Sequence, residues 1–212
     1  SLINVEIMKK EYPGTYQYLQ DCYDLLVPKC LNGGKGRDIK NATADTWYQY
    51  GRTQALTAFV DTPKLIVRIL SKEPMYAYDE NDMLIASGGT AGYCAIAKLP
   101  GSKYDLRYIQ AWLNHPYTEK IFQIMGSDFE GGFTARGTYL LKKIPFVELD
   151  FDDEKQKALY ESVIISTKKI NELNIVLEQK KDKASISVIE AEKENLSKQI
   201  EDNITKIYNL QF

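Results

Sequence analysis

The final segment of the chain, residues 151–212, contains neither glycine nor proline, although all 13 glycines and all 7 prolines occur in the first 150 residues. Apolar residues recur at helical spacing along this segment, and the pattern is interrupted near residues 180–187. A long stretch without helix breakers and with this periodicity predicts two long helices. A strict interval of seven residues is kept by Ile189, Leu196, Asn203 and Leu210.

Two arrangements would bury the apolar stripes of these helices. An antiparallel, coiled-coil-like hairpin would let the two stripes cover each other within one chain. One continuous helix that pairs with another molecule would cover them between chains. We expect the hairpin, and we therefore divide the chain into a globular part (1–150) and a C-terminal helical hairpin or spacer (151–212).

The first 150 residues predict a mixed α+β domain. A helix is expected over 15–27, after Pro13 at its start, and a second helical stretch over 105–125 is expected to break at His115 and Pro116. Short β-prone runs separated by turn residues predict a largely antiparallel sheet with packed helices. The expected strands are 64–70, 75–78, 83–86, 93–97 and 138–141.

Positive charge is concentrated in residues 28–72, where eight lysines and arginines face only three aspartates, although the whole chain has a formal net charge of −2. The segment also holds a glycine cluster, followed by Trp47, Tyr48 and Tyr50. Basic side chains on a flexible loop beside aromatic rings are typical of a surface that follows a phosphate backbone. A solvated loop above a buried tryptophan would show the same pattern, and both interpretations stay open.

Length and composition argue against a membrane-spanning protein, a secreted protein and a zinc-binding protein. With 212 residues and 44% hydrophobic content, the chain can bury a sizeable core, and it has neither an apolar run of about 18 residues nor a secretory leader pattern. We therefore expect a cytoplasmic protein. The start at Ser-Leu-Ile, without an initiator methionine, predicts a piece of a longer protein. The three cysteines, Cys22, Cys30 and Cys94, form no C-x-x-C pair, which favours reduced thiols and no zinc site.

Several short elements follow one another along the chain: Leu25-Leu26, Trp47-Tyr48 with Arg52, the segment 62–67, Tyr78-Asp79, Gly88-Gly89, the segment 108–114, Gly131-Gly132 and 143–145. Taken in this order, they resemble the TaqI-like C-terminal specificity domain. This is the target recognition domain of adenine-specific DNA methyltransferases and of fused Type IIG restriction-modification enzymes. The resemblance covers roughly residues 12–150, and the helical tail is similar to the spacer helices that such enzymes carry.

The resemblance implies a domain that reads base edges in the major groove of double-stranded DNA. Arginine and lysine can contact guanine, and asparagine or glutamine can contact adenine. A second candidate loop spans 127–138, where two glycines can bring the backbone close to DNA. The predicted DNA-binding residues are Lys35, Arg37, Lys40, Asn41, Arg52, Gln54, Lys64, Thr134 and Arg136.

Each of these residues also has a structural interpretation. A lone cation contacts phosphate or solvent more often than a base, and Arg136 would pair with Asp128 or Glu130 if the second loop were an ordinary turn. Four further residues are expected to support the loops rather than to contact bases: Trp47, Tyr48, Gly131 and Gly132.

Catalytic motifs are absent from the sequence. A methyltransferase needs a glycine-rich S-adenosylmethionine turn and an Asn/Asp-Pro-Pro-Tyr/Phe tetrapeptide for the flipped adenine, and the chain contains neither. The glycines at 33–36 and 88–92 lack the spacing of nucleotide-binding loops. The single histidine, His115, has no nucleophile in a recognisable motif. We therefore predict no catalytic residues, metal or cofactor within this chain.

The sequence thus predicts a non-enzymatic, sequence-specific DNA-recognition module. The parent that the resemblance implies methylates adenine N6, uses S-adenosylmethionine and magnesium, and in fused enzymes also cleaves DNA. Its partners would be duplex DNA and the methyltransferase domain of the same parent. The alternative is a protein-interaction module in which the C-terminal helices recruit a partner or dimerise. Charges at Leu196 and Ile200 would test this hypothesis.

Overall fold

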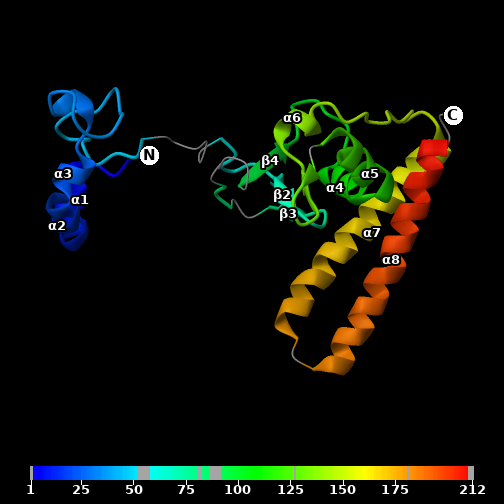
Figure 1. The fold of residues 1–212 in the computed structure, drawn as a ribbon. Coiled ribbons are helices and arrows are strands. Elements are labelled where there is room, and N and C mark those ends of the chain that lie inside the picture. Colours follow the sequence, from blue (N-terminus) through cyan, green and yellow to red (C-terminus); the bar gives the residue numbers. More distant parts are fainter. Residues whose placement is uncertain are drawn as a thin grey trace. The chain divides into compact units, whose positions relative to one another are not determined.

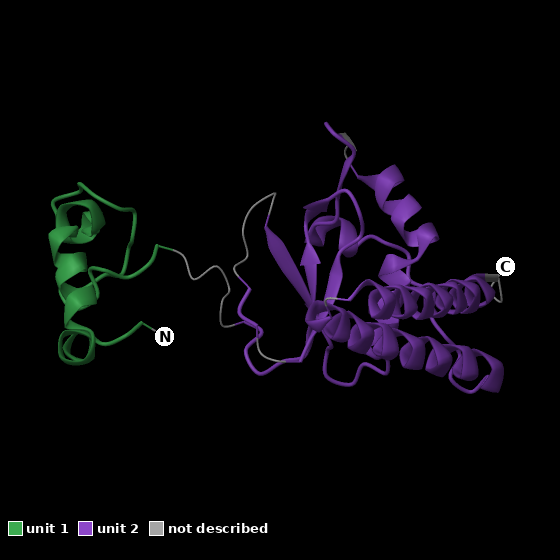
Figure 2. Cartoon of the chain, turned by 90° about the horizontal axis from the view of Figure 1, so that it is seen from below, with its two compact units in different colours: residues 1–53 green, residues 54–212 purple. Residues whose placement is uncertain are grey.

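The computed structural model describes residues 2–51, 58–80, 83–85, 92–126, 128–180 and 182–209, without the side chains of Asp128 and Asn209. The chain divides into two compact units, residues 1–53 and 54–212 (Figure 2). The expected division at residue 150, between a DNA-specificity domain and a C-terminal helical hairpin, stays a prediction. No helix in the described ranges is long and apolar enough to cross a membrane.

The first unit consists of short helices around a small aromatic core. Its elements are α1 (Val5–Glu11), α2 (Pro13–Asp21), α3 (Tyr23–Leu26) and a 3-10 turn, η1 (Lys29–Leu31). Val5 and Met8 of α1 pack against Trp47 and Tyr48, and the hydroxyl of Tyr48 donates to the carbonyl of Ile3. The single helix expected over 15–27 is two helices, because the backbone leaves the helical conformation at Cys22.

The second unit contains two small antiparallel sheets. One has the strand order β3-β1-β4, from β1 (Lys64–Arg68), β3 (Tyr76–Asp79) and β4 (Tyr93–Ala97). The other has the order β2-β6-β5, from β2 (Leu70–Ser71), β5 (Asp128–Phe129) and β6 (Phe133–Ala135). The mixed, largely antiparallel α+β class is confirmed.

Two expected strands differ from the structure. Residues 138–141 form a helical turn, α6 (Thr138–Leu141), in which the amides of Leu140 and Leu141 donate to the carbonyl of Gly137. A short apolar run fits a strand and a helical turn equally well, and here the turn buries Leu140 in the core. Residues 83–85 form no regular element, and Ala86 lies outside the described residues.

The longer helices of the second unit follow the predicted pattern. α4 (Leu106–Asn114) and α5 (Pro116–Met125) are separated at His115, and α7 (Glu154–Gln179) and α8 (Lys183–Asn209) form the antiparallel hairpin (Figure 1). Leu113 and Trp112 of α4 belong to the core beside the sheets, whereas Tyr108 and Ala111 belong to the core of the hairpin. α4 therefore lies between the sheet and the hairpin.

His115 joins this junction to α8. Its Nδ1 accepts a hydrogen bond from the amide of Tyr117 at 3.2 Å, which caps α5. Its Nε2 lies 3.2 Å from the carbonyl oxygen of Glu201 and 3.3 Å from the hydroxyl of Thr205. The ring is 4% exposed, and burial lowers its pKa below 6.5. This geometry fits a neutral ring that donates from Nε2.

We expect His115 to make stability depend on pH. Because its pKa is lower in the folded state, the unfolded state binds more protons once the pH falls below about 6.5. The contribution of His115 to the free energy of unfolding should therefore be fully present above that pH and should be lost as the pH falls through the pKa of the folded state. Urea unfolding at pH values on both sides of it, with a nuclear magnetic resonance titration of this single histidine, measures the effect.

The control is His115→Asn, which keeps a side chain able to cap α5 but does not titrate. Its unfolding free energy should lack the part of the pH dependence that belongs to the imidazole. Equal pH dependence in the two proteins would contradict the assignment.

Candidate nucleic-acid interface

The basic segment of the first unit forms a loop that is closed at its base. The amide of Arg37 donates to the carbonyl of Val27 at 3.1 Å, and the amide of Lys29 donates to the carbonyl of Arg37 at 2.9 Å. Gly36 sits in this stem with φ of +117°, and a Cβ atom there would lie 2.1 Å from the carbonyl oxygen of Val27. Only glycine fits this position without a backbone shift.

Arg37 is half-buried, and its guanidinium points back into the unit. Nη1 donates to the carbonyl of Gln49 at 3.0 Å, Nη2 donates to the carbonyl of Trp47 at 3.0 Å, and Nε donates to the carbonyl of Leu26. The guanidinium of Arg37 was predicted to contact DNA, but its donors bind main-chain carbonyl oxygens instead. Trp47 and Tyr48 are 4% and 8% exposed, so they lie in the core to which the loop is attached.

The outward side chains of this region are polar and basic. Lys35, Lys40 and Asn41, all predicted DNA contacts, are exposed. So are Lys29 and Asn32, which the sequence argument did not select although both flank the glycine cluster. Within the described part of the chain, no hydrogen bond or ion pair occupies these five side chains. Their donors are free to bind an external group.

Lys64 lies on β1 and is 0% exposed. Its Nζ is 2.7 Å from Oδ2 of Asp79 on β3 and also contacts the carbonyls of Phe59 and Thr62. In this conformation the ammonium is inaccessible to DNA, and its role is to tie β1 to β3. Arg52 and Gln54, two further predicted contacts, lie outside the described residues.

Arg136 is the largest fully buried side chain among the described residues. Its Nε and Nη2 donate to the carboxylate of Glu119 on α5, at 3.0 and 2.5 Å. Its Nη1 donates to the carbonyl and hydroxyl of Ser71, both at 2.9 Å, and to the carbonyl of Thr134. The predicted contact between Arg136 and DNA is therefore not available in this conformation. Arg136 forms its ion pair with Glu119 of α5, and not with Asp128 or Glu130 of the loop as its structural interpretation suggested.

The second candidate loop is a hairpin between β5 and β6. Gly131 and Gly132 have φ of +83° and +76°, so both occupy the left-handed region at the turn. Thr134 is half-buried within β6. The glycines allow the turn, while Arg136 fixes the base of the hairpin to β2 and α5. The hairpin is thus fixed at its base and has an exposed glycine tip.

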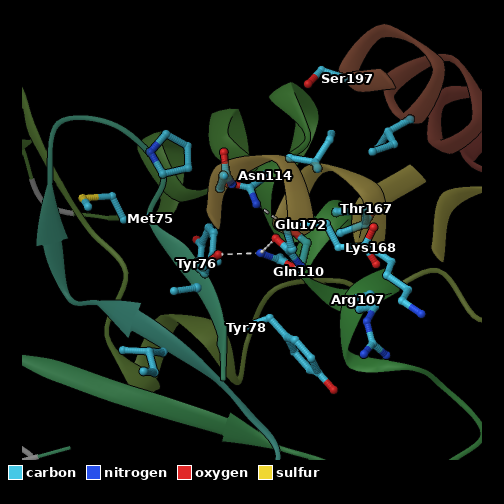
Figure 3. Close-up of a pocket in the computed structure, with 18 of the residues that line it drawn as sticks. Met75, Tyr76, Tyr78, Arg107, Gln110, Asn114, Thr167, Lys168, Glu172 and Ser197 are labelled. Atoms are coloured by element: carbon cyan, nitrogen blue, oxygen red, sulfur yellow. Dashed lines mark hydrogen bonds between the residues drawn. The ribbon is translucent and has the colours of Figure 1, made fainter. Parts of the chain in front are cut away.

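A groove of about 1060 Å³ opens between the first sheet and the helical hairpin (Figure 3). At its floor, the side-chain amide of Gln110 donates to the carbonyl of Tyr76 and exchanges hydrogen bonds with the amide of Asn171. Its rim carries charges of both signs, including Lys168 and Glu172. In the described ranges, no group of three His, Cys, Asp or Glu side chains could hold a metal ion.

No protein-family model matches the chain. The chain is 34% identical over 211 residues to the Type II restriction enzyme and methyltransferase RM.Eco57I of Escherichia coli. The match covers 98% of this chain and 20% of that protein. The chain therefore spans about a fifth of the length of this curated relative, and it is related to a segment of a restriction-modification enzyme.

The buried Arg136–Glu119 pair makes a prediction about stability. Arg136→Met should lower the free energy of unfolding by about 3–5 kcal/mol, because the Glu119 carboxylate loses its partner in a largely buried site. Adding Glu119→Gln should restore part of that loss. Urea unfolding followed by circular dichroism measures both.

The control is Lys120→Met, which removes an exposed cation on the same helix and should change stability by less than about 0.5 kcal/mol. A wild-type-like Arg136→Met protein would show that the pair does not stabilise the fold.

Proposed function

We propose that this chain is a sequence-specific DNA-recognition module of a restriction-modification enzyme, and more narrowly a TaqI-like C-terminal specificity domain. The observation that carries the proposal is the closed loop of the first unit. It presents unpartnered lysine and asparagine side chains from a fixed base, on a chain that is 34% identical to a segment of a restriction enzyme and methyltransferase.

The residues of this loop suit two different tasks. Lysine ammonium groups bind phosphate oxygens without regard to sequence and supply electrostatic affinity. Asparagine can form a paired hydrogen bond with the edge of an adenine in the major groove. We assign the first task to Lys29, Lys35 and Lys40, and the second to Asn32 and Asn41. Lys29, Asn32 and Lys35 lie within the closed segment, and Lys40 and Asn41 follow it in sequence. The glycine tip of the β5–β6 hairpin is the second proposed point of approach.

In this proposal the chemistry belongs to parts of the parent protein outside this chain. The parent would methylate adenine N6 with S-adenosylmethionine, and a fused endonuclease would use magnesium. The module would hold duplex DNA against the methyltransferase domain of the same parent, in the cytoplasm. The support for this step is the relative, whose name joins restriction and methylation in one protein and of which this chain spans a fifth.

A second function, protein interaction through the hairpin, is favoured by one observation. Ile175 of α7 and Val188 of α8 are 60% and 67% exposed near the turn between the helices. Ile200, in contrast, is 8% exposed and packs inside the hairpin core. A charge at Ile200 would therefore disturb folding itself, so the exposed pair is the better place to test association.

We expect the purified chain to retain a short asymmetric site from a random duplex library at low salt, read out by selection and sequencing. Lys35→Gln should reduce the magnitude of the slope of log K against log salt concentration by about 0.9, because one phosphate contact is lost. Lys198→Gln removes an equal charge from the exposed surface of α8, where Lys198 pairs with Glu194, and should leave the slope unchanged. A wild-type chain that retains no duplex at any salt concentration would refute the proposed function.

The interaction hypothesis predicts a different result. Wild-type protein would then associate with increasing concentration, and Ile175→Glu with Val188→Glu would abolish the association while circular dichroism stays unchanged. Sedimentation equilibrium without DNA distinguishes the two functions. A wild-type chain that sediments as a monomer over the whole concentration range would remove self-association from consideration.

A further inference from the structure

Arg37 belongs to the basic segment, but its guanidinium makes its hydrogen bonds inside the first unit. The three hydrogen-bond acceptors of its guanidinium are main-chain carbonyls, and they come from both sides of the loop in sequence. Leu26 precedes the loop at the end of α3, whereas Trp47 and Gln49 follow it. One planar side chain thus joins two segments that the loop separates.

The main chain of Arg37 closes the same stem. Its amide donates to Val27, its carbonyl accepts from Lys29, and Gly36 passes close to the carbonyl of Val27. Residues 29–36 are therefore held at both ends by one residue. The side chains of Lys29, Asn32 and Lys35 extend from the segment that this stem encloses.

Lysine cannot reproduce this arrangement. The guanidinium is a rigid fork whose donors point in several fixed directions, whereas an ammonium is a single point on a flexible stem. The acceptors here are spread over three carbonyls, so an ammonium would satisfy only part of the set. An Arg37→Lys change keeps the charge but removes the clamp, and this allows the two roles to be separated by experiment.

We infer that Arg37 is a positioning residue for sequence discrimination, which acts on DNA through the side chains of the loop that it closes and makes no contact with DNA itself. The inference rests on the proposed function of the loop. Base readout by an asparagine needs donor and acceptor at fixed positions, whereas flexible lysines follow phosphates even from a mobile loop. Loss of the clamp should therefore weaken the choice between sequences and leave the electrostatic component of binding in place.

The test uses the full 212-residue chain with two probes, a random-sequence duplex pool and the duplex that wild-type protein retains best. Arg37→Lys should raise the exchange rates of the Lys29 and Arg37 amides about tenfold or more, since hydrogen bonds to a charged group are lost. The preference for the selected duplex over the pool should fall about tenfold or more. The salt slope measured on the pool should not change, because no phosphate contact is removed.

A second variant opens the same stem without touching any charge. Gly36→Ala places a Cβ atom against the carbonyl of Val27 and should reproduce the exchange and discrimination results of Arg37→Lys. Gly14→Ala is the matched control, because a Cβ atom in this position of α2 meets nothing within 4 Å. The amides of Met8 and Tyr12, which bond within and just beyond α1, report whether the unit as a whole stays folded.

Three results would overturn the inference. Arg37→Lys could keep the wild-type preference, its salt slope could fall by about 0.9 as for a direct phosphate contact, or Gly36→Ala could open the stem without affecting the preference. A wild-type chain that binds neither probe would refute the proposed function itself. Failure of the function and failure of the positioning role are therefore distinguished by the wild-type measurement.

Discussion

The second unit depends on the burial of α4 on both of its sides. Six of its nine residues, Leu106, Tyr108, Gln110, Ala111, Trp112 and Leu113, are buried. A helix that is buried on two sides can hold the elements on either side of it in place. Gln110 makes this connection polar as well as apolar, because its amide bonds to Tyr76 on β3 and to Asn171 on α7. The sheet and the helical hairpin are thereby fixed to each other through one short helix.

Three positively charged side chains make their contacts within the fold. Lys64 and Arg136 are fully buried and paired with Asp79 and Glu119, and Arg37 is bound to main-chain carbonyls. Removing one partner of a buried pair leaves an uncompensated charge, so such residues are fixed in place. Fewer cations therefore remain for DNA than the net charge of the basic segment suggests. In the proposed function, electrostatic affinity would come from a few lysines, and selectivity would come from the geometry of the loop.

This distribution of charge fits a module that works beside other domains. In the proposed function, a chain with a formal net charge of −2 and a small set of exposed loop lysines would contribute more to sequence selectivity than to affinity for DNA. The match to the relative covers nearly the whole of this chain, but the relative is about five times as long. In the proposed function, the remaining phosphate contacts and the reaction itself belong to the rest of the parent.

Prediction from the sequence succeeded where the signal was local and periodic. The helices α7 and α8 follow from helical apolar spacing without glycine or proline, and the break at His115 follows from the adjacent Pro116. The strands at Lys64–Arg68 and Tyr93–Ala97 were expected from short β-prone runs. It failed at residues 138–141, where a short apolar run does not distinguish a strand from a helical turn.

Within the candidate site, the sequence determined which residue types the loop offers, and the tertiary structure decided which of them face outward. Lys35 and Arg37 look equivalent along the chain, yet one is exposed and the other is bound to carbonyls that follow it by 10 and 12 residues. The partner of Arg136 lies 17 residues away on another element. Burial and pairing depend on contacts between distant segments, so local composition could indicate a basic loop but could not assign its side chains to the core or to DNA.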